Sequence, residues 1–175
     1  MQMICWEWFE NVIEFDQKTA HAMEKYMDSN LRHVTFADLL TMSDVNVAHG
    51  FHAGVVEHLF STADVRQLIE MLDEVHKDRS QTGVFLEMYK FLTKKLKLKE
   101  DLAHCMAFAL EVLPTRLLQL TNNEISERLD AVFLEDWLRI SDVTLLWRRL
   151  DLYYPNRLHR SQACTISSRA NPYVV

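Results

Sequence analysis

The chain has 175 residues, 49% of them hydrophobic and 25% charged, which suits a globular protein that buries a core without disulfides or structural metals. Its three glycines and three prolines are too few for a many-stranded sandwich or barrel, which needs turn residues every 8–12 positions or so. A net charge of −6 argues against binding to duplex DNA, because that affinity comes mainly from neutralising phosphates. We therefore predict an all-α protein.

The N-terminal third contains two clear helix starts. The segment WEWFENVIEF (residues 6–15) has bulky, partly β-branched residues that fit a strand or a helix, and we favour a helix. Asp16 then suits the N-cap of a helix over residues 17–28. Thr35 and Asp38 have the spacing of a capping box, which predicts a short helix after them.

Two further start signals follow. Ser43 suits the N-cap of a helix that contains the histidine-rich segment VAHGFHAGVVEH (residues 47–58). Ser61 and Asp64 form a second capping box. After it, residues at i, i+3 and i+4 predict one buried helix face: Val65, Leu68, Ile69, Leu72 and His76.

The middle of the chain contains its most apolar segment. A loop over residues 78–83 precedes a second apolar stripe, made of Phe85, Met88, Tyr89, Leu92 and Leu96. Residues 101–113 follow and are predicted to form an apolar central helix. Pro114 is expected to end or kink that helix.

The predicted architecture is a compact, single-domain bundle of about eight helices around residues 101–113. Asn122-Asn123 is expected to break the chain, and Ser141 to cap the last helix. We assign the bundle to residues 1–155 and a flexible basic tail to residues 156–175. Residues 1–151 carry a charge of −9. The residues after Asp151 include no acid and carry +3, from Arg157, Arg160 and Arg169. This charge suits contact with an anionic partner.

The cysteines indicate a reducing compartment. Cys5, Cys105 and Cys164 are odd in number, far apart and outside any CxxC pattern. The first residues lack the features of a signal peptide, and no apolar run is long enough for a membrane helix. We therefore expect a cytoplasmic or nuclear protein that is not secreted. Cys105 follows His104, but adjacent helical residues point about 100° apart and form no catalytic dyad.

The histidines of residues 47–58 do not have the spacing of a zinc site. On a helix, His49 and His52 lie about 60° apart, whereas His58 lies about 180° from His49. We therefore predict no metal site. Gly50 and Gly54 would instead mark a place where a neighbouring helix approaches closely.

A second interpretation of the same segment involves haem. Val47-Ala48-His49-Gly50 resembles the distal-histidine helix of globins, and residues 72–79 (LDEVHKDR) resemble the proximal-histidine helix. The 27 residues between His49 and His76 are also near the globin separation. The resemblance covers about residues 45–95 and implies a haem cofactor with His76 as proximal and His49 as distal residue. Without it, we expect no cofactor.

Another resemblance concerns regulators of cell death. Residues 39–44 (LLTMSD) resemble the Leu-xxx-small-Asp core of death-promoting motifs in the Bcl family, and residues 135–138 (EDWL) resemble its later acidic-tryptophan segment. A bundle around an apolar central helix is also the shape of that family. The resemblance implies a Bcl-like regulator that binds helical motifs of other proteins.

Lysines form the one basic cluster of the chain, at Lys90, Lys94, Lys95, Lys97 and Lys99. A solvated helix end explains them, since cations near a helix C-terminus are stabilising by about 0.3–1 kcal/mol. A docking patch for an acidic partner is the alternative.

Aromatic residues near the ends of the chain are the main sign of function. We predict a non-enzymatic, regulatory or adaptor module that binds a protein partner, or a second copy, by burying aromatic anchors. The predicted anchors are Trp6, Trp8, Trp137 and Trp147, and the predicted charged rim contacts are Lys94, Lys95 and Arg148. The alternatives are a globin-like haem protein, a Bcl-like regulator and an enzyme of unrecognised type.

Overall fold

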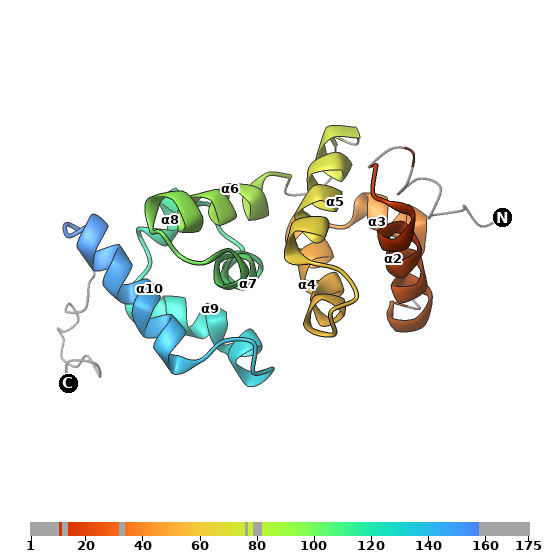
Figure 1. Ribbon diagram of the computed structural model, residues 1–175. Coiled ribbons are helices and arrows are strands. Elements are labelled where there is room, and N and C mark those ends of the chain that lie inside the picture. Colours follow the sequence, from red (N-terminus) through yellow and green to blue (C-terminus); the bar gives the residue numbers. More distant parts are fainter. Residues whose placement is uncertain (1–10, 12–13, 32–33, 76, 79–81, 158–175) are drawn as a thin grey trace. The chain divides into compact units, whose positions relative to one another are not determined.

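The computed structural model describes residues 11, 14–31, 34–75, 77–78 and 82–157 (Figure 1). Within these residues all regular structure is helical and no strand occurs, which confirms the predicted all-α class. The same part of the chain contains no helix with the length and apolar character needed to cross a membrane.

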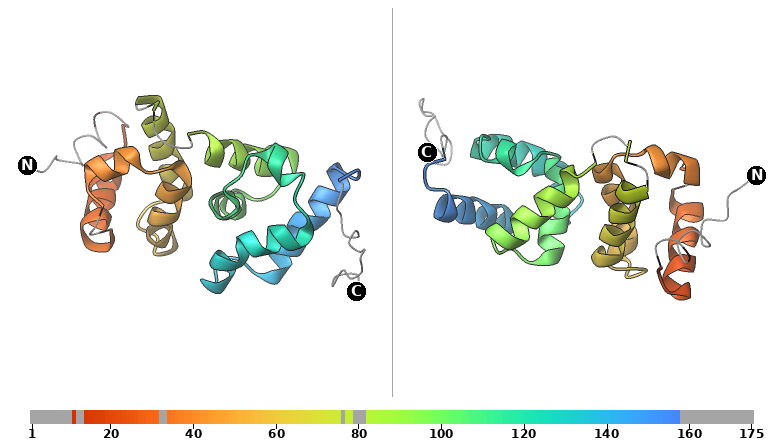
Figure 2. Two further views of the ribbon diagram at one scale, coloured as in Figure 1. Left: turned by 180° about the vertical axis from the view of Figure 1, so that it is seen from behind. Right: turned by 90° about the horizontal axis from the view of Figure 1, so that it is seen from above.

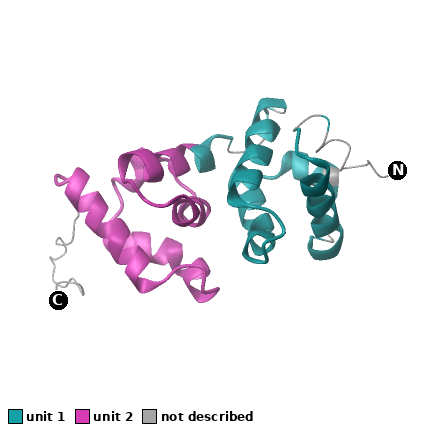
Figure 3. Cartoon of the chain, in the orientation of Figure 1, with its two compact units in different colours: residues 1–86 teal, residues 87–175 magenta. Residues whose placement is uncertain are grey.

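The chain forms two compact units, residues 1–86 and residues 87–175 (Figure 3). Their boundary falls inside helix α6 (Val84–Lys90). Each unit has its own buried core, which the apolar periodicity of the sequence did not indicate. The division into two units describes which residues contact one another, and does not show whether each unit folds independently. The predicted single domain over residues 1–155 therefore stays a prediction.

Four helices that lead up to α6 are described in full in unit 1: α2 (Gln17–Asn30), α3 (Phe36–Thr41), α4 (Asp44–Val56) and α5 (Thr62–Val75). Their predicted starts are confirmed. Asp16 Oδ1 accepts the Thr19 N–H at 2.7 Å. Thr35 and Asp38 exchange hydrogen bonds at 3.0 and 3.1 Å. Ser43 caps α4, and Ser61 and Asp64 form the second capping box.

The core of unit 1 is built around α4, which lies beside α2 and α5 in both views of Figure 2. Tyr26 of α2, Phe51 of α4 and Phe60 form an aromatic cluster with ring centroids 5.5–5.8 Å apart. The Tyr26 hydroxyl also donates to the Gly50 carbonyl at 2.8 Å. Each aromatic pair is worth about 0.5–1.5 kcal/mol beyond its buried area.

The end of α4 explains why Phe60 reaches this cluster. His58 adopts a left-handed conformation (φ 64°), and the Leu59 N–H donates to the Gly54 carbonyl at 2.9 Å. This is the Schellman pattern, which turns the chain back over its helix. A Cβ atom on Gly54 would come within 3.0 Å of Phe60 Cε2 and nearer still to the tip of the ring. Gly54 is therefore required by a side chain that follows α4, and not by a neighbouring helix as predicted.

Unit 2 continues from α6 with a π-helical turn and four helices: η1 (Phe91–Lys95), α7 (Glu100–Leu110), α8 (Pro114–Leu117), α9 (Asn122–Leu134) and α10 (Ile140–Tyr153). Helix α7 is its buried centre and packs against α9 and η1. It is shorter than predicted, because Glu111 adopts a left-handed conformation (φ 58°) that ends the helix. Leu113 is 45% exposed, and Pro114 begins α8.

The starts of the last two helices differ from the prediction. Thr121 caps α9 through a capping box with Glu124, at 2.9 and 3.1 Å, so Asn122 lies inside the helix. For α10, the Arg139 N–H donates to the Asp142 carboxylate at 2.9 Å. Ser141 is therefore the second residue of α10 and not its cap.

Two arginines bind the C-terminal ends of other helices in unit 2. Arg128 of α9 donates from Nη1 to the Leu110 carbonyl, at the end of α7, at 3.1 Å. Arg149 of α10 donates from Nη1 to the carbonyls of Leu96 and Lys97, after η1, at 2.7 and 3.0 Å. The last carbonyls of a helix have no partner within it, and cations are favourable there. These contacts tie α9 and α10 to the rest of the unit.

A third arginine corrects the predicted boundary of the basic tail. Arg157 was assigned to the flexible tail, but it is buried. Its Nη2 donates to Asn122 Oδ1 at 2.6 Å and lies 3.6 Å from the half-exposed Asp151 carboxylate. The end of α10 is thereby fixed to the start of α9. Residues 158–175 of the predicted tail lie outside the described residues.

We expect alanine to have opposite effects at the two glycines of α4. Gly54→Ala should lower the free energy of unfolding, since overpacking against the buried Phe60 ring costs about 1–3 kcal/mol. Gly50→Ala is the matched control. Its Cβ atom would lie 3.8 Å from Leu31, an ordinary contact, so it should gain about 0.5–1 kcal/mol of helix propensity. Urea unfolding curves measure both changes, and equal effects at the two positions would contradict the account.

Arg157→Ala should lower the free energy of unfolding by about 1.5–3 kcal/mol, because a buried, charge-assisted hydrogen bond to Asn122 is lost. The half-exposed Asp151 carboxylate remains hydrated and limits the loss. Arg148→Ala removes an exposed arginine of α10 and should change stability by less than about 0.5 kcal/mol. Equal stability of the two variants in thermal denaturation would show that Arg157 has no structural role.

Candidate binding groove between α9 and α10

Helix α9 has more apolar surface than its contact with α7 uses. Ile125, Leu129 and Val132 are buried, and α9 packs more extensively against α7 than against α10. The loop after α9 is also held in place. Asp136 is left-handed (φ 64°), the Trp137 N–H donates to the Val132 carbonyl at 3.0 Å, and the Trp137 ring meets Phe108 of α7 edge-on at 6.0 Å. The two helices of this hairpin are therefore held apart along part of their length.

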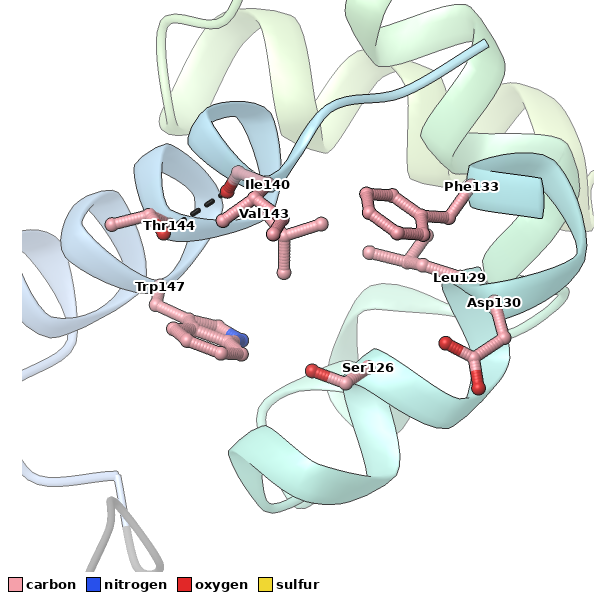
Figure 4. Close-up of a pocket in the computed structure, with 8 residues that line it drawn as sticks. All are labelled: Ser126, Leu129, Asp130, Phe133, Ile140, Val143, Thr144 and Trp147. Atoms are coloured by element: carbon pink, nitrogen blue, oxygen red, sulfur yellow. Dashed lines mark hydrogen bonds between the residues drawn. The ribbon is translucent and has the colours of Figure 1, made fainter. Parts of the chain in front are cut away.

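An apolar groove of about 290 Å³ lies between α9 and α10 (Figure 4). The same spacing of i, i+3, i+4 and i+7 places its lining on one face of each helix: Ser126, Leu129, Asp130 and Phe133 of α9, and Ile140, Val143, Thr144 and Trp147 of α10. In Figure 4, Trp147 and Val143 face Leu129 and Phe133 across the opening. Asp130 is the only ionisable side chain in the lining.

The apolar surface continues beyond the groove. Ile140, which lines it, is 69% exposed, and Leu134, which follows Phe133, is 81% exposed. Single exposed apolar side chains are common on monomers. Large apolar side chains exposed at the margin of an apolar groove, such as Ile140, are instead typical of interaction sites.

The α9 wall of the groove contains one charged side chain, the exposed Asp130. Glu124 and Glu127 are also exposed on α9, but they line a separate pocket with Arg116 and Arg128. The carboxylate of Asp130 gives the groove a negative charge, which favours cationic ligands.

The structure places one of the four predicted tryptophan anchors in the groove. Trp147 lines it and is half-buried. Trp137 is also half-buried, but its ring packs against Phe108 and its backbone ends α9, so it supports the hairpin. Trp6 and Trp8 lie outside the described residues.

The predicted charged contacts lie in two different places. Arg148 is exposed on α10, next to Trp147. Lys94 and Lys95 are exposed at the end of η1, beside the carbonyls that Arg149 binds. Arg149, which marks the position of these lysines, follows Trp147 by two residues. It therefore lies about 200° around α10 from Trp147, on the side away from the groove. The two lysines are therefore not part of the groove, and the docking patch that they were predicted to form stays a prediction.

Sequence reasoning missed most of the lining of the groove. The shared spacing of Ser126–Phe133 and Ile140–Trp147 was visible in the sequence. Only Trp147 was selected from it, because a sequence does not show which of two apolar faces a neighbouring helix covers.

The predicted histidine pair is only partly described. His49 is exposed on α4, His52 is buried, and His76 lies outside the described residues. No group of three or more metal-ligating side chains occurs among the residues that the structure covers. Haem binding through His49 and His76 stays a prediction.

Cys105 is buried in α7, and burial, with smaller contributions from Asp142 and Glu135, raises the pKa of its thiol to about 12. We therefore expect no reaction of Cys105 with iodoacetamide in the folded protein at pH 8, where only about one thiol in ten thousand is ionised. A Cys5→Ser/Cys164→Ser variant leaves Cys105 as the single thiol, and mass spectrometry counts the adducts. The same variant in guanidinium chloride is the control and should react fully. Rapid labelling of the folded variant would contradict the burial.

The segment that resembles the Bcl motif is divided between two helices. Helix α3 ends at Thr41, Ser43 caps α4, and the buried Asp44 accepts the Gly83 N–H at 2.9 Å. The Asp44 carboxylate therefore has a structural partner, and Bcl-like regulation stays a prediction. No protein-family model, curated protein or solved structure matches this chain.

Proposed function

We propose that the chain is a protein-binding module that receives one cationic, amphipathic helix of a partner protein in the groove between α9 and α10. The observation that carries the proposal is the apolar groove itself, with the half-buried Trp147 in its wall and the exposed Ile140 at its margin. Aromatic residues in apolar pockets are the usual centres of binding energy at protein interfaces. The function is binding and not catalysis.

The dimensions of the groove favour a helical ligand. From Ser126 to Phe133, its wall extends for seven residues, or about 10 Å, which is two helical turns. A partner helix presents anchors at i, i+3 or i+4, and i+7 over the same length. Burial of each anchor contributes about 1.5–3 kcal/mol, and the cost of association offsets part of the sum. An affinity of about 1–100 μM follows for an isolated peptide.

The charge of the groove sets the chemistry of the ligand. Asp130 is exposed in the α9 wall of the groove, and Arg148 is exposed on α10. A partner helix should therefore present lysine or arginine towards α9. Exposed ion pairs are worth only about 0.2–1 kcal/mol each, so they orient the helix while the apolar contacts provide most of the affinity.

Selection from a display library of random 16-residue peptides tests the proposal. We expect enriched peptides to have large apolar residues at helical spacing and a net positive charge. Ile140→Asp should weaken their binding at least about tenfold, since a carboxylate then occupies the margin of an apolar groove. Leu152→Asp is the matched control, because Leu152 is also on α10, is 66% exposed and does not line the groove.

Two results would contradict the proposed function. Peptides that bind wild type and Ile140→Asp equally well would place the binding surface elsewhere. Enrichment of acidic peptides would show that the charge of α9 does not select the ligand.

A further inference from the structure

The place where the described chain ends lies close to the groove. Arg157 is bound to Asn122, the first residue of α9, at 2.6 Å. Ser126, the nearest residue of the groove on α9, is four residues further along the helix, or about 6 Å. The guanidinium group of Arg157 is therefore about one helical turn from the groove.

The residues that follow have the chemistry expected of a ligand for this groove. Residues 158–175 contain Arg160 and Arg169 and no acidic residue. They also contain large apolar side chains at three separated places, Leu158, Ile166 and the sequence PYVV at 172–175. Cationic character combined with apolar anchors is the ligand chemistry that the α9–α10 groove favours.

Acidic residues of α9 lie near both places. Glu124 is exposed in the first turn of the helix, near Asn122 where Arg157 is bound, and the exposed Asp130 lines the groove. Arg160 is three residues after Arg157 and so within about 10 Å of it, which allows contact with the first of these carboxylates. Ile166 is nine residues after Arg157, within about 30 Å, and so easily reaches the groove.

We propose that the groove is occupied in the free protein by the chain's own residues 158–175, bound in cis, with Arg160 and Arg169 against α9 and Ile166 or Tyr173 as the apolar anchor. This inference rests on the proposed function, because the tail is the ligand that a partner helix must displace. Tethering provides an effective concentration of about 1 mM. If the free tail binds with a Kd of about 100 μM, the groove is about 90% occupied, and the apparent affinity for an external peptide falls about tenfold.

The first test uses full-length chains and does not require a partner. The indole N–H resonance of Trp147, assigned by its loss in Trp147→Phe, reports on the groove. Arg160→Glu/Arg169→Glu should shift this resonance, because the tail then leaves the acidic face of α9. Addition of a synthetic peptide of residues 158–175 should return the resonance towards its wild-type position and leave wild type itself unchanged. A Trp147 resonance identical in wild type and variant would overturn the inference.

Lys94→Glu/Lys95→Glu is the matched control, because it makes the same change in net charge in the same unit, at lysines that do not line the groove. It should leave the Trp147 resonance where wild type has it. An equal shift in both double variants would show that net charge, and not tail docking, moves the resonance. A shift that depends on protein concentration, with dimers in sedimentation, would overturn binding in cis in favour of a second copy.

The second test separates this inference from the proposed function. The peptides selected against the groove should bind Arg160→Glu/Arg169→Glu about tenfold more tightly than wild type. Equal affinity for both chains would overturn occupation by the tail and leave the proposed function intact. Failure to select any groove-binding peptide would contradict the proposed function. The shift of the Trp147 resonance would still show whether residues 158–175 occupy the groove.

Discussion

The burial of α7 is the constraint on which unit 2 depends. Residues 103–108 of this helix are buried without interruption, so neighbours must cover it on several sides. Helix α9 covers one of these sides with Ile125, Leu129 and Val132. The i, i+3, i+4, i+7 face of α9 that contains Phe133 then extends beyond the contact with α7. The apolar groove is the consequence of a helix whose apolar surface is wider than one neighbour covers.

Arginine side chains also hold α10 in place. Arg149 binds carbonyls after η1, and Arg157 binds Asn122 at the opposite end of the hairpin from Trp137. Trp137 itself fixes the loop against Phe108. Because α10 is held at these points, its position relative to α9 is fixed at both ends of the hairpin. A groove that is formed before the ligand arrives reduces the ordering cost of binding.

Local features of the fold were predictable, whereas features that depend on tertiary contacts were not. The caps at Asp16, Thr35 and Ser43 were identified correctly because a side chain and a backbone N–H three residues away define each of them. Ser141 was wrong because Asp142 offered a competing partner for Arg139, and both assignments fit the sequence. Helix α7 was identified, but its end was not, because the left-handed Glu111 has no signature in the residue type.

The candidate site was predictable only in part. Trp147 was selected as an aromatic near the chain end, and it does line an apolar groove. Trp137 was selected for the same reason and instead supports the hairpin from within. Nothing in the two sequence contexts separates them, since both tryptophans lie beside a buried leucine and near a charged residue. The difference comes from the packing of α7 against the hairpin. Trp137 packs on Phe108 of α7, whereas Trp147 lines the groove.

The most direct test of the central claim is the mapping of methyl resonances during titration with a groove-binding peptide. Leu129, Ile140 and Val143 line the groove, whereas Leu68 and Leu72 are fully buried in unit 1. We expect the methyl resonances of the first three residues to shift with a common Kd and those of Leu68 and Leu72 to stay unchanged. Shifts confined to unit 1, or spread evenly over both units, would contradict the assignment of the α9–α10 groove as the binding site.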